Sequence, residues 1–337
     1  MATSKRPLPA NNLSFDGFFS AYYGANKWSA LRQNLLAPKQ SCALINRYHP
    51  SNETLFPADE FRRFESLCSP TMTVMEPIDF IVTPTVPRPL DFSHYPMCAA
   101  SLLAVLALDI QPNDRVLDLC ASPGGKSLAI LQRFDASNHL TSNEMSQDRY
   151  ARLVNTLKSH VPPNIYHKQV RTLHINATRQ NIWTSTFDKI LVDAPCSSER
   201  HLVNSSSTHL WSVKRSKASA RRQLELLRTA MRCVNPEAGT IVYSTCSLSP
   251  YENDLVIEQF LKLYPNRVQV HRQVFPFGDA TEHGWMVLPQ PWGPFYLCVL
   301  HVRDANRSST DEQTTWRFHR DSTTSEESEE EDEEEGA

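Results

Sequence analysis

Residues 116–126 read Val-Leu-Asp-Leu-Cys-Ala-Ser-Pro-Gly-Gly-Lys, an apolar strand that runs directly into a glycine turn. The residues that follow, up to Phe134, have helical spacing, with Leu128 and Leu131 on the inner side. Glycines at the start of a helix let the backbone approach a ligand, and the free amides there attract an anionic group. The spacing is neither GxGxxG nor a Walker loop, which disfavours dinucleotide and ATP sites.

Segments of strand type and helix type alternate around this stretch. We expect strands over residues 115–120, 139–144, 167–174, 189–193, 240–244 and 295–302, and helices over residues 97–108, 126–134, 147–160, 219–234 and 251–263. This alternation predicts an α/β fold with a doubly wound, Rossmann-like sheet. Ligands of such sheets bind at the carboxyl ends of the strands.

The chain is expected to divide into four segments. Residues 1–12 are a flexible N-terminus or part of a presequence, and residues 13–95 are an N-terminal extension that opens with a helix over about 13–36. Prolines between residues 49 and 95 favour loops and short strands, one of them at 79–82. The catalytic domain is expected over residues 96–304, and a disordered acidic tail over residues 305–337.

The net charge of −3 hides an uneven distribution of charge. Residues 321–337 hold ten of the 37 acidic residues and no Lys or Arg, so the remainder of the chain is basic. A basic body is compatible with RNA binding, although many proteins that bind no nucleic acid share it. No apolar run approaches the ~20 residues of a membrane-spanning helix, so we expect a soluble protein that is not associated with a membrane.

Eight cysteines show no regular pairing and no CxxC spacing, so we expect neither a disulfide framework nor a metal site. Two of them follow predicted strands. Cys196 comes after Val-Asp-Ala-Pro at 192–195, and Cys246 comes after Tyr-Ser-Thr at 243–245. The other six are interpreted as small buried hydrophobic residues.

Two thiols at strand ends suit chemistry on a pyrimidine. A thiolate is a strong nucleophile, and cytosine C5 is inert until a nucleophile adds at C6. After that addition C5 can take an electrophilic methyl group, and a base must remove the C5 proton before the thiolate leaves. Asp193 could hydrogen-bond the base edge and stabilise the charge that develops there. The pattern therefore indicates methyl transfer to a base.

Glu144 ends the strand that follows the glycine turn. Rossmann-type sites place an acid here that accepts hydrogen bonds from ribose hydroxyls. Alone, Glu144 would more often be a helix-capping acid, and a Pro-Gly-Gly sequence would more often be only a turn. On consecutive strands, the two features together favour a nucleoside-bearing cofactor.

Three stretches resemble motifs I, IV and VI of the Nop/Nol/Sun (Sun-domain, RsmB-like) family of RNA cytosine-C5 methyltransferases, in the family's order and separation. They cover residues 116–126, 192–196 and 243–248. The resemblance spans roughly residues 13–302 and is strongest to the mitochondrial ribosomal RNA branch, the fourth animal member. It implies a class I S-adenosylmethionine-dependent methyltransferase sheet with an N-terminal helical extension.

The resemblance also implies roles for individual residues. Cys246 would attack C6, Cys196 would assist loss of the C5 proton and release of product, and Asp193 would bind the target cytosine beside Lys126. The residues that would hold S-adenosyl-L-methionine are Ala121, Ser122, Pro123, Gly124, Gly125, Lys126, Glu144, Arg149, Asn176 and Asp193. The family usually has Asp-Gly where Asn176 and Ala177 stand. We expect weaker cofactor binding there, with Asn176 as the acceptor for the adenine amine.

A basic run separates the two cysteine motifs and comprises Lys214, Arg215, Lys217, Arg221 and Arg222. Such a run is as often a solvated face as a binding site. Its position beside the predicted site, where flanking phosphates must pass, supports RNA contact. Arg200 and His201 are candidates for holding the target strand. The target base must be unstacked to reach Cys246.

The substrate and compartment remain open between several hypotheses. The bias towards Lys and Arg in residues 1–40 favours a mitochondrial presequence, although the aromatic residues there resemble a packed helix, and a nuclear or cytoplasmic location is the alternative. Mitochondrial small-subunit ribosomal RNA is the expected substrate, with mitochondrial tRNA as the alternative. A DNA cytosine methyltransferase and a non-catalytic ribosome-assembly factor are the competing functions. The resemblance further implies a candidate protein partner of mTERF type.

Overall fold

The structure, a computed structural model, describes residues 6–38, 41–50, 62–63, 79–83, 91–179, 186–275, 277–290 and 292–303. Residues 62–63 and 79–83 are described by their backbone alone. The predicted acidic tail lies outside the described residues, and so does most of the proline-rich stretch. Contacts along the chain group residues 1–304 into one unit.

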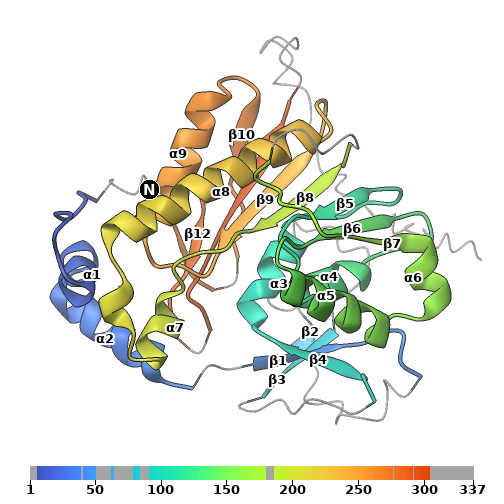
Figure 1. Cartoon of the computed structure of the whole chain (residues 1–337), viewed down its shortest axis with the longest axis horizontal. Helices are drawn as coiled ribbons and strands as arrows, with labels where there is room; N and C mark the ends of the chain where they lie inside the picture. Colours follow the sequence, from blue (N-terminus) through green and yellow to red (C-terminus); the bar gives the residue numbers. More distant parts are fainter. Residues whose placement is uncertain are drawn as a thin grey trace, which may run out of the picture. The chain divides into compact units, whose positions relative to one another are not determined.

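A mixed sheet forms the centre of this unit (Figure 1). Within the described residues its order is β11(Asp279–Ala280)-β12(Trp285–Val287)-β13(Phe295–Val302)-β9(Thr240–Thr245)-β8(Lys189–Asp193)-β5(Arg115–Asp118)-β6(His139–Asn143)-β7(Val170–Leu173), with β10(Val268–His271) also paired to β13. The pairs from β9 to β7 are parallel, whereas β13 runs antiparallel to β9. The strand order reverses between β5 and β8, the point at which doubly wound sheets bind their ligands. The predicted fold class is confirmed.

Helices cover both faces of the sheet. α3(Ala99–Leu106), α4(Gly125–Leu131), α5(Gln147–His160) and α6(Pro163–Gln169) lie between β4 and β7 in the chain, and α7(Glu199–Asn204), α8(Val213–Cys233) and α9(Asp254–Leu263) follow β8. Short 3-10 helices span Thr208–Leu210 and Pro250–Glu252. None of the helices among the described residues is long and apolar enough to cross a membrane.

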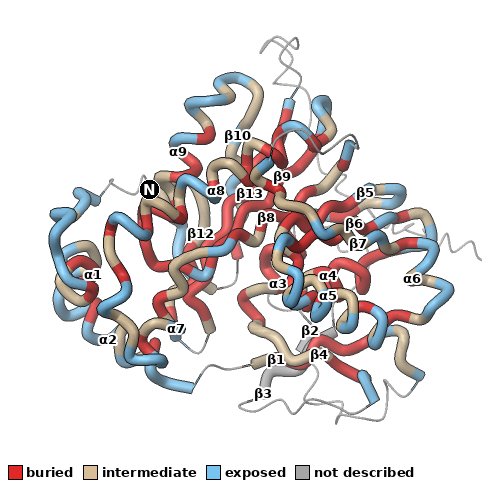
Figure 2. The backbone as a smooth tube through the Cα atoms, viewed as in Figure 1, coloured by how far each residue is buried: buried red, intermediate tan, exposed pale blue. Residues whose placement is uncertain are grey.

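The core divides into two apolar clusters, one on each face of the sheet. Leu117, Ile190 and Ile241 belong to the cluster that includes α8 and α9 residues. Their chain neighbours Val116, Leu191 and Val242 belong to the cluster that includes α3 and α4 residues. Side chains along a strand alternate between faces, so apolar residues at successive positions bury both sides of these strands. Figure 2 shows the central strands β8, β9 and β13 as largely buried.

The N-terminal extension has two parts. The helix predicted over 13–36 is interrupted at Gly24, whose φ of 88° ends α1(Phe15–Tyr23) and starts α2(Ala25–Leu36). Phe18 and Phe19 of α1 are fully buried and contact Trp211 in the connection between α7 and α8. A small sheet follows, with order β2(Arg62–Arg63)-β3(Asp79–Thr83)-β1(Ser41–Ile45)-β4(His94–Met97).

Several predicted boundaries are wrong. The strand expected over 167–174 begins only at Val170, because Pro163 at the first position of α6 starts a helix that runs to Gln169. α8 begins six residues before its predicted start, where the Ser212 hydroxyl accepts a hydrogen bond from the amide of Arg215. The bounds of α5, β8 and β13 match their predictions.

A buried polar cluster connects β5 to the start of α4. Asp118 ends β5 and is fully buried. The hydroxyl of Ser127 donates to its Oδ2 at 2.7 Å and lies 2.9 Å from the Ser142 hydroxyl of β6. Burial raises the pKa of Asp118 to about 7.

This pKa gives a prediction for stability. A native pKa above the unfolded value of about 4 means that the native state binds the extra proton, so this stabilisation is present below pH ~4 and is lost as pH rises towards 7. We expect Asp118→Asn to remove this pH-dependent contribution to the free energy of unfolding, because the amide does not titrate. Between pH 5 and 8 the free energy of unfolding of the variant should fall less than that of the wild type, by on the order of 2 kcal/mol. Urea denaturation across this range measures it.

The exposed Asp148→Asn variant is the control and should keep the wild-type profile. Identical pH profiles for wild type and Asp118→Asn would contradict the assignment.

Candidate active site

The two strand-end cysteines meet at one edge of the sheet. β8 and β9 are parallel neighbours, with Asp193 opposite Ser244. Cys246 directly follows β9, and Cys196 lies three residues beyond β8. The two sulfur atoms are 3.0 Å apart, with Cys246 exposed and Cys196 half-buried. The hydrogen bond to Cys246 and burial raise the pKa of Cys196 well above that of a free thiol.

An ion pair lies beside the cysteines at the same edge. Lys126 Nζ is 2.7 Å from Asp193 Oδ2, and the Ser244 hydroxyl donates to Asp193 Oδ1 at 2.8 Å. The Lys126 ammonium also lies 5.5 Å from the centre of the Phe295 ring. Burial alone would lower the pKa of Lys126, but the Asp193 carboxylate more than offsets it, so that this pKa is raised. Lys126 is therefore a cation that holds the Asp193 carboxylate in place.

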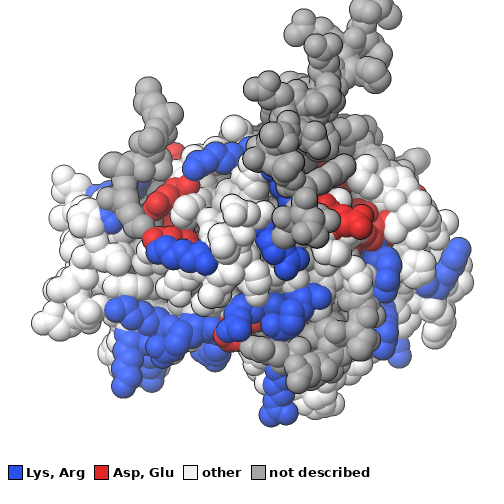
Figure 3. Space-filling model, turned by 90° about the horizontal axis from the view of Figure 1, so that it is seen from above, with Lys and Arg blue, Asp and Glu red and all other residues white. Residues whose placement is uncertain are grey.

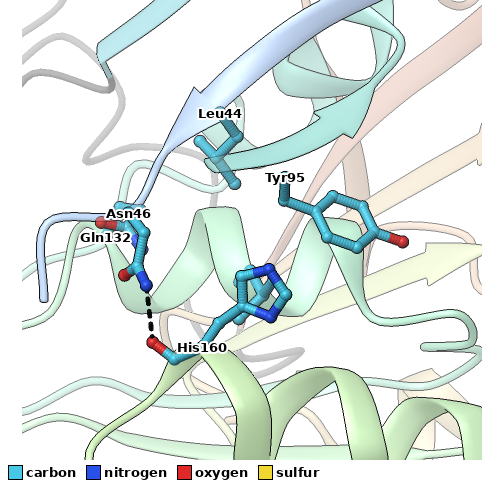
Figure 4. Close-up of a pocket in the computed structure, with 6 residues that line it drawn as sticks. Leu44, Asn46, Tyr95, Gln132 and His160 are labelled. Atoms are coloured by element: carbon cyan, nitrogen blue, oxygen red, sulfur yellow. Dashed lines mark hydrogen bonds between the residues drawn. The ribbon is translucent and has the colours of Figure 1, made fainter. Parts of the chain in front are cut away.

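The glycine turn between β5 and α4 depends on its two glycines. Gly124 has a φ of 115°, a conformation that side-chain-bearing residues rarely adopt. A Cβ on Gly125 would lie 2.7 Å from Tyr95 Cε1. Figure 4 shows Tyr95, from β4, beside His160 and Leu44, with its hydroxyl directed away from them. Asn46 ties this region to α5, since its side-chain amide donates to the His160 carbonyl at 2.9 Å.

The predicted cofactor residues surround this turn. The amide of Ala121 donates to Asn143 O, and the amide of Gly124 donates to Ala121 O, both at 2.8 Å. The Ser122 hydroxyl donates to Arg149 O at 2.8 Å, while Pro123 follows a cis peptide bond.

The carboxylate of Glu144 accepts from the amide of Ser146, at the start of α5, and also lies 3.3 Å from Arg149. The bond to Ser146 is a capping contact for α5, and Glu144 is buried.

Asn176 lies in the turn that follows β7. Its carboxamide oxygen accepts hydrogen bonds from the amide of Thr178 at 3.0 Å and from the Thr178 hydroxyl at 2.8 Å. Because an amide oxygen has two lone pairs, these bonds use its acceptor capacity. Asn176 closes a turn after β7 with these two bonds, and its contact with the adenine amine stays a prediction.

Arg200 has hydrogen-bond partners within the protein. Its guanidinium donates to three backbone carbonyls: those of Gly293 at 3.0 Å, Leu35 at 3.1 Å and Ala37 at 3.1 Å. These bonds join α7 to the end of α2 and to the segment before β13, which gives Arg200 a structural role, and its contact with the target strand stays a prediction. His201, on the same helix, is exposed.

The predicted basic run lies at the start of α8. Lys214, Arg221 and Arg222 are exposed. Two members have protein partners: Arg215 donates to Leu210 O at 2.7 Å, and Lys217 donates to Asn11 and lies over the Tyr251 ring. Figure 3 shows Lys and Arg side chains gathered in a band on the side of the molecule that carries α8 in Figure 1.

The sequence analysis did not identify Glu199 and Glu252, which lie fully buried behind the cysteines. Each accepts a hydrogen bond from Ser197, the residue after Cys196. Both carboxylates stand close to the cysteine motifs in the sequence, within Ser-Ser-Glu-Arg at 197–200 and Pro-Tyr-Glu-Asn at 250–253. Their closeness to the cysteine motifs in the sequence is the signal by which the two glutamates could have been identified.

Comparison with known proteins identifies the family. The family model for the 16S rRNA methyltransferase RsmB/F matches residues 105–298. The chain is 31% identical to the 5-cytosine rRNA methyltransferase NSUN4 of Mus musculus, over 89% of this chain and 91% of that protein. It is 40% identical to a mitochondrial tRNA (cytosine(34)-C(5))-methyltransferase of Danio rerio, over 61% of this chain and only 60% of that protein.

Solved structures support the fold. NSun6 from Pyrococcus horikoshii with SFG aligns with a TM-score of 0.68 at 17% identity, over 88% of this chain and 99% of that chain. A methyltransferase homologue from the same organism aligns with a TM-score of 0.64 at 21% identity, over 83% of this chain and 92% of that chain. With the family model covering more than half of its length, the chain belongs to the RsmB/F family of RNA cytosine-C5 methyltransferases.

Proposed function

We propose that this enzyme methylates C5 of a cytosine in mitochondrial small-subunit ribosomal RNA, with Cys246 as the nucleophile and S-adenosyl-L-methionine as the methyl donor. The observation that carries the mechanism is the pair of sulfur atoms 3.0 Å apart beside the Lys126–Asp193 ion pair. Family membership supports the reaction class, and the geometry supports the assignment of roles.

In this mechanism the Cys246 thiolate adds to C6 of the cytosine and forms a carbon–sulfur bond. The electron pair displaced from the C5–C6 double bond makes C5 nucleophilic, and C5 takes the methyl group. Once the Cys246 sulfur is bonded to C6 and no longer raises the pKa of Cys196, the Cys196 thiol releases its proton to solvent and takes the C5 proton as a thiolate. The electrons of the C5–H bond restore the double bond, and Cys246 leaves as a thiolate. Asp193, fixed by Lys126 and Ser244, accepts a hydrogen bond from the exocyclic amine and, once N3 takes a proton as the ring gains charge, from N3–H.

Two observations favour Cys246 over Cys196 as the nucleophile. Cys246 is exposed, whereas Cys196 is half-buried. The hydrogen bond to Cys246, burial and the nearby carboxylates raise the pKa of Cys196, which keeps its proton on the sulfur. Attack requires a thiolate, so a cysteine held as a thiol is the poorer nucleophile. The alternative in which the Pro-Cys cysteine attacks, as in DNA cytosine methyltransferases, is disfavoured.

The glycine turn fits the proposed cofactor. Gly125 allows Tyr95 to pack directly against the turn, since a Cβ there would lie 2.7 Å from Tyr95 Cε1, and Glu144 lies at the carboxyl end of the adjacent strand. We assign residues 121–126 to the methionine part and Glu144, with Arg149 nearby, to the ribose. When bound, the cofactor supplies the electrophilic methyl group. The complex of NSun6 with SFG, an S-adenosylmethionine analogue, supports a nucleoside ligand in this fold.

The first turns of α8 are the proposed RNA surface. Gln223 of this helix donates to Pro195 O at 2.9 Å, and the Ser216 hydroxyl lies 2.7 Å from that of Ser249. The buried side of these turns thus contacts both cysteine loops, while Arg221 and Arg222 face solvent. A strand whose target base reaches Cys246 would pass its flanking phosphates near them.

The names of similar proteins support two RNA classes. NSUN4 is named as an rRNA methyltransferase and matches along nearly its full length, which favours ribosomal RNA. The zebrafish tRNA methyltransferase has the higher identity over a shorter stretch, so mitochondrial tRNA is the second candidate. The word mitochondrial in the name of the tRNA methyltransferase is the basis for proposing a mitochondrial location.

The cysteine roles are tested by separate substitutions. Cys196→Ala should accumulate a covalent RNA–protein adduct that withstands SDS, because attack proceeds while release stalls. Cys246→Ala should form no adduct and no 5-methylcytosine. Gel electrophoresis of RNA-bound protein with S-adenosylmethionine present measures both, and sequencing the trapped RNA identifies the substrate.

The control is Cys233→Ala, a buried core cysteine that should behave as wild type. An adduct formed by Cys246→Ala but not by Cys196→Ala would reverse the assignment.

The cofactor site is tested at the glycine turn. Gly125→Ala should weaken S-adenosylmethionine binding at least about tenfold, or ~1.4 kcal/mol, because the new Cβ displaces the turn from Tyr95. Isothermal calorimetry measures this. Gly17→Ala, in α1, is the matched control with wild-type affinity. Absence of measurable affinity in the wild type would instead favour the non-catalytic assembly factor.

The RNA surface is tested by salt dependence. The Arg221→Ala/Arg222→Ala double variant should bind RNA more weakly and reduce the slope of log K against log salt by about 1.4, since each phosphate contact contributes ~0.7 for single strands. The exposed Arg152→Ala, on α5, should keep the wild-type slope. Arg200→Ala should lower the melting temperature instead. An unchanged slope in the double variant would remove α8 from the RNA surface.

A further inference from the structure

Two buried carboxylates lie directly behind the cysteine pair. Glu199 begins α7, and Glu252 ends the 3-10 helix at Pro250–Glu252; both are fully excluded from solvent. A buried carboxylate is costly unless strong hydrogen bonds compensate for the lost water. The hydrogen-bond donors to this pair therefore show what the two side chains hold in place.

Glu199 bridges the two cysteine loops. Its Oε1 accepts from the Ser197 hydroxyl and from the Ser247 hydroxyl at 3.0 Å, and its Oε2 accepts from the amide of Leu248 at 2.9 Å. Ser197 directly follows Cys196, and Ser247 directly follows Cys246. One carboxylate thus joins the two chain segments that carry the sulfur atoms.

Glu252 connects the same assembly to α8. It accepts from the amide of Ser197 at 2.9 Å, from the Ser216 hydroxyl at 2.8 Å and from Gln223 Nε2 at 2.9 Å. Gln223 in turn donates to the carbonyl of Pro195, the residue before Cys196. The Cys196 loop is therefore held on both sides of the cysteine.

The two carboxylates also influence each other. Burial and the nearby Glu252 raise the pKa of Glu199 to about 7. A proton shared by two close carboxyl groups avoids the repulsion of two buried charges. The other titratable groups that face the pair are Cys196, Tyr23 and Tyr243. Tyr23 belongs to α1, so the N-terminal extension contributes to this environment.

We propose that Glu199 is a positioning residue for methyl transfer: its carboxylate bridges Ser197 and Ser247 and so holds Cys196 and Cys246 with their sulfur atoms at 3.0 Å. Glu252 supports the bridge from α8. The catalytic consequence rests on the function proposed above, whereas the geometric consequence applies to the free protein. Two measurements separate them.

The first measurement probes the distance between the sulfur atoms without RNA. Diamide, an azodicarboxamide oxidant, takes up two electrons and two protons as the thiols of Cys196 and Cys246 join in a disulfide. The rate is followed by mass spectrometry of the linked peptides and normalised to alkylation of the same thiols. We expect Glu199→Ala to slow disulfide formation at least about tenfold, because the three bonds of the bridge are lost together.

Glu199→Gln is the conservative variant. Its carbonyl oxygen can accept from Leu248, and its amide can donate to the two serine hydroxyls, which also act as acceptors. It should keep the wild-type rate within about threefold. Glu258→Ala, which replaces a half-buried acid of α9 paired with Lys262, is the control and should match wild type. A wild-type rate in folded Glu199→Ala, or equal slowing in Glu199→Gln, would overturn the proposal.

The second measurement separates the steps of catalysis. Glu199→Ala should lower kcat at least about tenfold while S-adenosylmethionine affinity and KM for RNA stay within about twofold, and Glu199→Gln should restore kcat.

If Glu199→Ala does not fold, the Ser197→Ala variant tests the bridge in its place. It removes one branch of the bridge and should slow disulfide formation by about threefold with an unchanged melting temperature, and a wild-type rate there would overturn the proposal.

The two proposals can fail separately. If the variants show the expected disulfide rates but the wild-type protein methylates no RNA, the Glu199 bridge stands and the proposed function is wrong.

Discussion

The parallel pairing of β8 with β9 is the constraint on which the candidate site depends. It sets Asp193 opposite Ser244, so that the segments following β8 and β9 leave the sheet at the same edge. Cys196 and Cys246 are 50 residues apart in the sequence, yet their sulfur atoms come within 3.0 Å because each loop starts from one of these neighbouring strands. The backbone ladder thus offsets the entropy cost of closing a long loop.

Three sets of contacts refine the site that this edge creates. The Lys126–Asp193 ion pair holds a carboxylate beside the sulfur atoms, and the Glu199 bridge joins the two cysteine loops. The third set comes from the N-terminal extension: Tyr95 packs against Gly125, and Arg200 donates to carbonyls at the end of α2. The extension is therefore part of the support for both the cofactor turn and the cysteine loops.

Strong periodicity made some elements predictable. α5 carries apolar residues at helical spacing, and β8 and β13 are continuous apolar strands, so their bounds follow from local pattern. The strand predicted at 79–82 is confirmed as β3, whereas β10, β11, β12 and the other strands of the small N-terminal sheet were missed. These strands are short or partly polar, and their pairing comes from distant partners. The segment that begins at Pro163 shows the same limit, because its mostly polar residues carry no clear period, and Pro163 at the first helical position starts α6.

The sequence by itself determined where most of the parallel strands lie along the chain, the identity of the glycine turn and the two thiols, and the family to which they point. These properties reside in residue type and local spacing. Only the tertiary structure decided which polar groups were already satisfied. Asn176 uses its oxygen in a turn, Arg200 binds backbone carbonyls, and Glu199 joins two loops. The physical reason is that a hydrogen bond requires its partners within about 3 Å, and long-range packing alone sets which partners meet.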